Sequence, residues 1–144
     1  MPEEPRRGAA PTASGPGRVL VAVYAVFALA TTSRAVVQIA RDLDEAPVAY
    51  SLSALSAVVY VLATVGLARS GAGARRLALL ACSVELVGVL VVGTVSLLLP
   101  QDFPRATVWS WYGAGYLFIP LVLPVLGLLW LRRTAAPRRA AAAR

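Results

Sequence analysis

Hydrophobic residues fall into four long runs that short polar segments separate. The runs cover residues 19–40, 48–68, 77–99 and 108–131. Each is close to the ~20 apolar residues that a helix needs to cross a hydrocarbon core of about 30 Å. Because the connections are short, sequential helices are expected to be antiparallel neighbours. The pattern predicts an all-α polytopic membrane protein, folded as an antiparallel four-helix transmembrane bundle.

Each run carries a stripe of small or polar residues at helical spacing, while Leu and Val occupy most other positions. The stripes are Thr31, Arg34 and Gln38; Ser53, Ser56, Tyr60 and Thr64; Ala81, Glu85, Gly88, Val92 and Ser96; and Gly113, Tyr116, Pro120, Pro124 and Gly127. Small residues let helices approach closely, and hydroxyls bond from one helix to another. We therefore expect the four stripes to share one interior, and packing is the default role of their Ser, Thr and Gly residues.

The fourth run contains two prolines near its middle, Pro120 and Pro124. A proline inside a helix lacks the N–H that would bond the carbonyl four residues earlier. Within one continuous helix, these two would free the carbonyls of Tyr116 and Pro120. The sequence therefore predicts a broken fourth helix, with a kink near Pro120 and the Tyr116 carbonyl facing the interior. Trp109, Trp111 and Tyr112 at one end of this run and Trp130 at the other are typical of interfacial aromatic belts.

The charged residues assign an orientation. All fourteen basic residues are Arg, and eleven of them lie before the first run, between the second and third, or after the fourth. By the positive-inside rule, both termini are cytoplasmic and the protein resides in the cell membrane. The composition is 58% hydrophobic with mean hydropathy +0.71, which is too apolar for a soluble domain. The flanking arginines indicate contact with the lipid bilayer and its anionic lipids, not with nucleic acid.

Two tails flank the transmembrane domain of residues 18–133. Residues 1–17 have the composition of a disordered cytoplasmic tail, and residues 134–144 form a basic cytoplasmic tail that is either helical or disordered. A secretory signal is the alternative for the first run, with Val19 to Phe27 as its apolar core and Ala28 to Ala30 as its cleavage site. The helical apolar spacing continues beyond Ala30, which favours a membrane span.

Arg34 and Glu85 are the charged residues that lie well inside the runs. Intramembrane charges are rare and are functional candidates by default. Counted from the nearest cytoplasmic arginines, Arg34 lies about 10 Å farther out than Glu85, at ~1.5 Å per residue. By the same count, Ser53 and Tyr116 share the depth of Arg34, and Tyr60 shares that of Glu85.

These depths predict that Arg34 joins the first helix to the broken fourth, through Tyr116 or the freed carbonyls. Glu85 either pairs with Arg34 or bonds Tyr60 and stays protonated. The candidate polar site is thus Arg34, Gln38, Ser53, Tyr60, Glu85 and Tyr116. It is an internal staple or a site for a proton or small ligand, and a third alternative has Arg34 extending to the outer headgroups.

Catalytic chemistry has little support. The chain has no His, so the commonest general base and metal ligand is missing. Its single cysteine, Cys82, is expected to be a small packing residue. Tyr60, Cys82 and Glu85 lack a His or Lys partner, and no loop is long enough for a catalytic domain. We expect no enzymatic activity, no metal and no cofactor.

Several segments resemble small four-span integral membrane proteins of actinobacteria. They are Ser33 to Gln38, Ala46 to Tyr50, Glu85 to Gly88, Thr107 to Ser110, Gly113 to Tyr116 and Pro120 to Pro124. The resemblance covers residues 18–133 and implies a membrane location but no activity. An all-arginine basic set also suggests a GC-rich bacterial genome. Small multidrug transporters have the same number of spans, but they carry their essential Glu in the first span, where this chain has Arg34.

Two functions therefore compete. The first is a small accessory or interaction module of the membrane, with Arg34 and Glu85 as an interior staple. The alternative is a transporter or channel component that uses these two residues for a proton or small ligand. Four helices leave little room for a pathway, so the alternative requires a homodimer. An accessory module would bind a second copy or another membrane protein.

Overall fold

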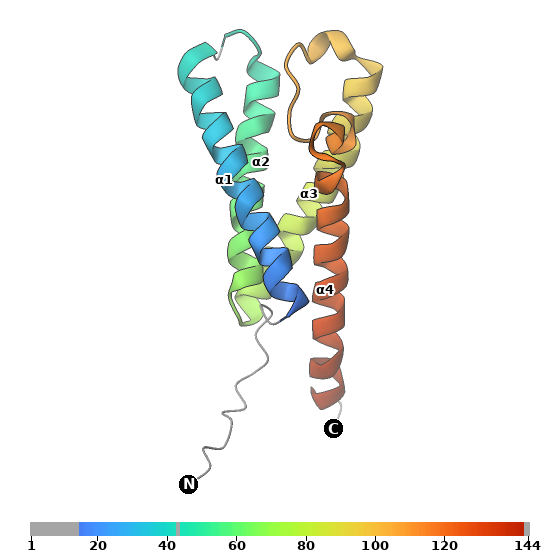
Figure 1. Ribbon diagram of the computed structural model, residues 1–144. Helices are drawn as coiled ribbons and strands as arrows, with labels where there is room; N and C mark the ends of the chain where they lie inside the picture. The colour runs from blue at the N-terminus through green and yellow to red at the C-terminus, as the bar shows by residue number, and fades with distance from the viewer. Residues whose placement is uncertain (1–14, 43, 143–144) are drawn as a thin grey trace.

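Four long helices dominate the computed structural model, which describes residues 15–42 and 44–142 (Figure 1). They are α1 (Pro16–Asp42), α2 (Pro47–Ala68), α3 (Ala72–Leu98) and α4 (Ile119–Ala142). Two short 3-10 segments, η1 (Pro100–Asp102) and η2 (Ser110–Tyr116), lie between α3 and α4. Every regular element in the described ranges is helical, in agreement with the sequence pattern. The predicted N-terminal tail falls outside these ranges up to residue 14, and the predicted C-terminal tail continues α4 as far as Ala142.

Sequential helices run antiparallel, so α1 begins and α4 ends at the same end of the bundle (Figure 1). α1 packs along α2, α2 along α3, and α3 along α4. Gly66 allows α2 to approach α3 closely, because a Cβ there would lie 2.6 Å from the backbone nitrogen of Ala78. α1, α2 and α3 are each long and apolar enough to cross a membrane, and η2 with α4 makes a fourth candidate if the bent pair is one span.

The surface is apolar and the interior is mixed, which reverses the usual pattern of a soluble protein. Large side chains on the outer faces of the helices are exposed, among them Val26, Leu29, Val58, Leu80, Val87 and Leu129. The interior buries small, aromatic and polar residues. Residues of the predicted stripes that are buried include Thr31, Ser53, Ser56, Tyr60, Glu85, Ser96, Pro120 and Pro124.

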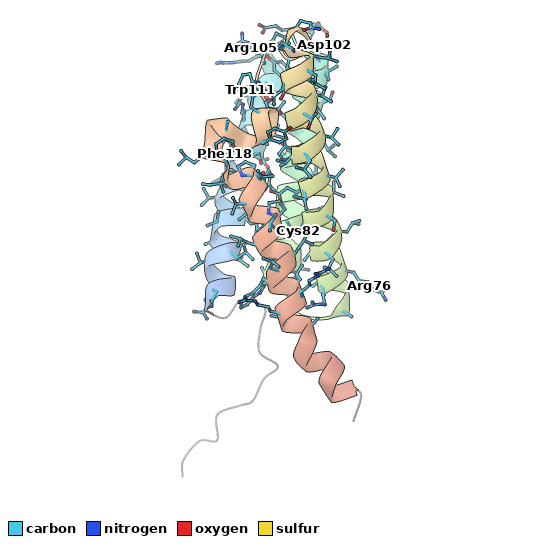
Figure 2. All side chains as sticks on the ribbon, turned by 90° about the vertical axis from the view of Figure 1, so that its right-hand side faces the viewer. Arg76, Cys82, Asp102, Arg105, Trp111 and Phe118 are labelled. Atoms are coloured by element: carbon cyan, nitrogen blue, oxygen red, sulfur yellow. The ribbon has the colours of Figure 1, made fainter. Side chains whose placement is uncertain are left out.

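Polar contacts tie the connections together at both ends of the bundle. At the end where α4 finishes, Arg75 donates a hydrogen bond to the Thr134 hydroxyl at 3.1 Å. At the opposite end, the exposed Arg105 forms a 2.8 Å salt bridge with Glu45, which joins the α1–α2 loop to the segment after η1. Figure 2 shows the two ends of the bundle, with Asp102 and Arg105 at one end and Arg76 near the other.

The fourth run is broken near Pro120, as the sequence predicts, but the prolines do not cause the break. η2 and α4 meet at 99°, and the break lies at Leu117 and Phe118, before Pro120. Pro120 occupies the first turn of α4, where an N–H has no intrahelical acceptor, so the proline disrupts nothing there. It does not free the Tyr116 carbonyl, because Tyr116 does not belong to α4. Pro124 alone leaves a carbonyl without its helical donor, that of Pro120.

The bend depends on backbone in the left-handed region. Trp111, Tyr112 and Gly113 have φ of 51°, 59° and 79°, and Leu117 and Phe118 have φ of 57° and 59°. Only glycine adopts this region without strain, and each other residue costs roughly 1–2 kcal/mol. Such a conformation persists only where the surrounding structure determines it.

α3 supplies the contacts that hold this strained turn. The Ser96 hydroxyl accepts a hydrogen bond from the Trp111 backbone at 2.9 Å, and the Tyr112 hydroxyl lies 2.7 Å from that of Thr94. Gly93 leaves space for the Tyr112 ring, which would lie 2.4 Å from an added Cβ. Contacts with α3 thus hold the turn at Trp111 and Tyr112, which keeps the first part of the run 108–131 out of a helix. The second left-handed pair, Leu117 and Phe118, is exposed and bonds back to the turn, since the Phe118 N–H donates to the Gly113 carbonyl at 3.0 Å.

Candidate functional site

A buried carboxyl group lies at the centre of the bundle. Glu85 on α3 is fully buried, and its Oε2 accepts a 2.7 Å hydrogen bond from the hydroxyl of Tyr24 on α1. Tyr24 is also fully buried, and its hydroxyl lies 3.4 Å from Sγ of Cys82, one turn before Glu85 on α3. One phenol therefore connects α1 to two positions of α3. A carboxyl group so enclosed is far more stable in the neutral form than as an uncompensated charge.

Three polar atoms around this centre have no hydrogen-bond partner among the described residues. They are Oε1 of Glu85, the Tyr60 hydroxyl and Nε1 of Trp109. The Tyr60 hydroxyl lies close to both the carboxyl and the indole, without hydrogen-bonding geometry. Natural proteins pair nearly all buried polar groups, so these neighbouring atoms are candidates for a shared hydrogen-bond network or for a small polar ligand.

Close packing creates this enclosed centre. The Tyr60 ring lies 6.1 Å from that of Tyr24 between centroids, which places α2 against α1. The Trp109 ring covers Gly88, where an added Cβ would lie 2.7 Å from the ring. On α4, Gly127 leaves space for Cys82, whose Sγ would lie 2.8 Å from an added Cβ. Figure 2 labels Cys82 where α3 faces α4. All four long helices thus contribute to the enclosure.

Arg34 forms a second polar centre, nearer the end that carries η1. Its Nη1 donates to the Tyr116 hydroxyl on η2, and its Nη2 donates to the Ala106 carbonyl at 2.8 Å. The Tyr116 ring also packs against Phe27 of α1, with 6.0 Å between centroids. Arg34 thus fastens α1 to the segment that contains the strained turn. A guanidinium suits this role, since it presents several donors in a rigid plane.

The six predicted site residues separate into different environments. Arg34 meets Tyr116, and Glu85 lies near Tyr60, as the depth count suggested. Ser53 is buried on α2, where its carbonyl accepts a 2.8 Å bond from the Ser56 hydroxyl. Gln38 is half-buried, and its Oε1 has no partner in the described part of the chain.

Neither predicted partner of Glu85 is hydrogen-bonded to it: the direct pairing with Arg34 does not occur, and the nearby Tyr60 hydroxyl makes no hydrogen bond to the carboxyl. Each residue has its own phenolic partner, Tyr116 for Arg34 and Tyr24 for Glu85. The reason is depth, because a separation of about 10 Å along the helices exceeds what both side chains span while keeping these bonds.

Two residues of the centre were missed by the sequence analysis. Tyr24 continues the α1 stripe at helical spacing, seven residues before Thr31. Its depth, counted from Arg18, is within about 5 Å of that of Glu85 at ~1.5 Å per residue. The same count applied to every tyrosine would therefore have found it. Trp109 was assigned to an interfacial belt, yet it is 1% exposed. Nothing in the local sequence distinguishes it from Trp111, which is 44% exposed.

The site chemistry is that of weak acids and hydrogen-bond donors. Within residues 15–42 and 44–142, no three His, Cys, Asp or Glu side chains are grouped to hold a metal ion. The central groups are a carboxyl, two phenols, a thiol and an indole. Such a set can hold or exchange a proton, but it has no paired base to activate a nucleophile.

No protein-family model matches the chain, and no curated protein or solved structure matches it.

Proposed function

We propose that the chain is an integral protein of the cytoplasmic membrane, in which α1, α2, α3 and the bent η2–α4 pair are four spans. Support comes from the apolar outer surface of the helices, which suits hydrocarbon and not water. Among the described residues, the start of α1, the α2–α3 connection and the second half of α4 carry arginines, and all three belong to the end at which α1 begins and α4 finishes. Both termini are then cytoplasmic by the positive-inside rule. The resemblance to small four-span actinobacterial proteins supports the same location.

Within the membrane, the chain acts as a small accessory or interaction module without catalytic activity. The proposal rests on the contacts of Arg34. Its side chain donates two hydrogen bonds within the chain, one to the Tyr116 hydroxyl and one to the Ala106 carbonyl. An arginine used in this way fastens the broken span to α1, which is a structural role. The surface left for recognition is the apolar exterior of the helices, which fits lipid or the span of another protein.

Reporter fusions test the proposed location and orientation. Fusions at Gly17, Asp44, Gly73, Asp102 and the C-terminus should report inside, outside, inside, outside and inside. An external C-terminus would contradict the proposal, because it would leave η2 and α4 outside any span. A mature protein that begins at Thr31 would support the signal-peptide alternative for the first run.

A second candidate function rests on the three unpartnered atoms near Glu85. The buried Glu85 carboxyl lies beside the Tyr60 phenol and the Trp109 indole N–H, neither of which has a hydrogen-bond partner among the described residues. Such a group could bind a proton or a small polar ligand. In this reading, the chain is a component of a transporter or channel and acts as a dimer.

Reconstitution into liposomes separates the two candidates. The accessory role expects no proton flux above that of empty liposomes. A flux that is lost in Glu85→Gln but kept in Glu45→Gln, which changes a loop carboxylate, would establish the transport role instead.

A further inference from the structure

An apolar groove runs along the outside of the molecule between α1 and α4. It has a volume of about 510 Å³, which lies within the roughly 300–1,000 Å³ of small-molecule sites. Val19 and Val23 line it from α1, and Val122 and Leu126 line it from α4. Val19 and Val122 are 66% and 50% exposed, so the groove is open to the surroundings along its length. Figure 2 shows α1 beside α4 on this side of the bundle.

One end of the groove is charged. Arg133 lines it there, next to Trp130, and Ile119 marks the opposite end on α4. A guanidinium recognises phosphate through paired hydrogen bonds, and Trp is typical of the headgroup level of a membrane. The groove therefore has an apolar body and an anion-binding end, as an amphiphile requires.

The α4 side of the groove is long enough for one leaflet of a bilayer, whereas α1 lines a shorter stretch, from Pro16 to Val23. Ile119 and Arg133 are separated by about 21 Å along α4, at ~1.5 Å per residue. Half of a ~30 Å hydrocarbon core is about 15 Å, so the groove covers one acyl chain and reaches the headgroup with Arg133.

We propose that this groove binds one anionic phospholipid of the cytoplasmic leaflet, with an acyl chain along α1 and α4 and the phosphate at Arg133. The proposal deepens the proposed function and rests on its membrane location. It gives the interaction module a defined lipid ligand in addition to the general attraction between arginines and an anionic membrane surface.

A second copy of the chain fits the groove less well than a phospholipid. In the described part of the chain, the exposed acidic residues Glu45 and Asp102 lie at the end of the bundle away from the α4 C-terminus, since Figure 2 labels Asp102 and Arg105 there and Glu45 pairs with Arg105. A copy inserted in the same orientation would therefore bring its own arginines to Arg133. Like charges at that position oppose association, whereas a phosphate neutralises the arginine.

Native mass spectrometry of the full chain, released from detergent micelles, tests the proposal with phosphatidylglycerol and phosphatidylcholine as probes. The unmodified chain should retain one phosphatidylglycerol, with a preference over phosphatidylcholine on the order of fivefold, as expected for one arginine at an anionic headgroup. Arg133→Gln should abolish this preference. Arg132→Gln removes the same charge from the neighbouring residue, which does not line the groove, and should leave the preference unchanged.

A matched pair of valines on α4 tests the apolar part of the groove. Val122→Trp should fill it and prevent retention of either lipid. Val125→Trp places the same side chain at an exposed position outside the groove and should leave retention unchanged. Both variants keep α3 and the central site intact, so circular dichroism should show the same helix content.

Three results would overturn the proposal. One is equal lipid retention by all four variants, which would mean unspecific lipid around the helices. Another is equal loss in Arg132→Gln and Arg133→Gln, which would mean attraction by overall charge. The third is a dimer that Val122→Trp disrupts and that forms without lipid, which would make the groove an interface between copies. If the reporter fusions alternate as expected while Arg133→Gln has no effect, the groove proposal fails and the membrane proposal stands.

Discussion

Replacing Arg34 and Tyr116 singly and together tests whether the bent η2–α4 pair is fastened to α1. Arg34 makes two hydrogen bonds to the η2 region, one to the Tyr116 hydroxyl and one to the Ala106 carbonyl. Tyr116→Phe removes only the first bond and keeps the ring against Phe27. Arg34→Leu removes both bonds and leaves the Tyr116 hydroxyl without its donor.

The expected losses follow from these contacts. A hydrogen bond to a charged group contributes roughly 1.5–3 kcal/mol, so Tyr116→Phe should lower the free energy of unfolding by about 1.5 kcal/mol and Arg34→Leu by about 3 kcal/mol. Arg34 is only half-buried, which favours the lower part of the range. In double-mutant cycles on a membrane protein, the coupling energy of a hydrogen bond between helices averages ~0.6 kcal/mol and reaches ~1.7 kcal/mol. We expect a coupling of about 1 kcal/mol, so that the double variant loses less than the two single losses together.

The free energy of unfolding is measured by titrating the protein with SDS in mixed micelles and following helix content by circular dichroism. The control is the cycle of Arg34→Leu with Glu85→Leu, since these residues have separate partners. That control should be additive within about 0.5 kcal/mol. Additive losses for Arg34 and Tyr116, or a strong coupling between Arg34 and Glu85, would refute the separation of the two polar centres.

Two further substitutions test the central site in the same unfolding assay. Gly88→Ala should lower the free energy of unfolding by about 1–3 kcal/mol, because the new Cβ would meet the Trp109 ring at 2.7 Å. Gly73→Ala, with no atom within 4 Å of its Cβ, is the matched control, and an equal loss in both variants would contradict the argument. Tyr24→Phe should cost about 1–3 kcal/mol, because it leaves Oε2 of Glu85 without its donor. Tyr24→Phe should have little further effect once Glu85→Leu is present, and an undiminished loss there would show that the phenol stabilises the bundle by other means.

Interior residues could be identified from the sequence to the extent that they follow helical spacing. Glu85, Tyr60 and Pro124 were assigned to interior stripes, and the structure buries all three. The partner of Glu85 was not found, because helical spacing identifies a face but not which residue on another helix meets it. Depth along the helices narrows that choice, since Tyr24 lies within about 5 Å of the depth of Glu85 at ~1.5 Å per residue.

What the sequence determined by itself is the number of apolar segments, their antiparallel order and the distribution of charge between the two ends. Each depends on interactions within one helix or with the solvent, and so on local composition and period. Tertiary structure alone decided the course of residues 108–118. Their apolar composition predicts a helix, but the left-handed turn at Trp111 and Tyr112 is held by Ser96, Thr94 and the space above Gly93. Contacts with α3 therefore outweigh the local helical preference, which no pattern within the segment reveals.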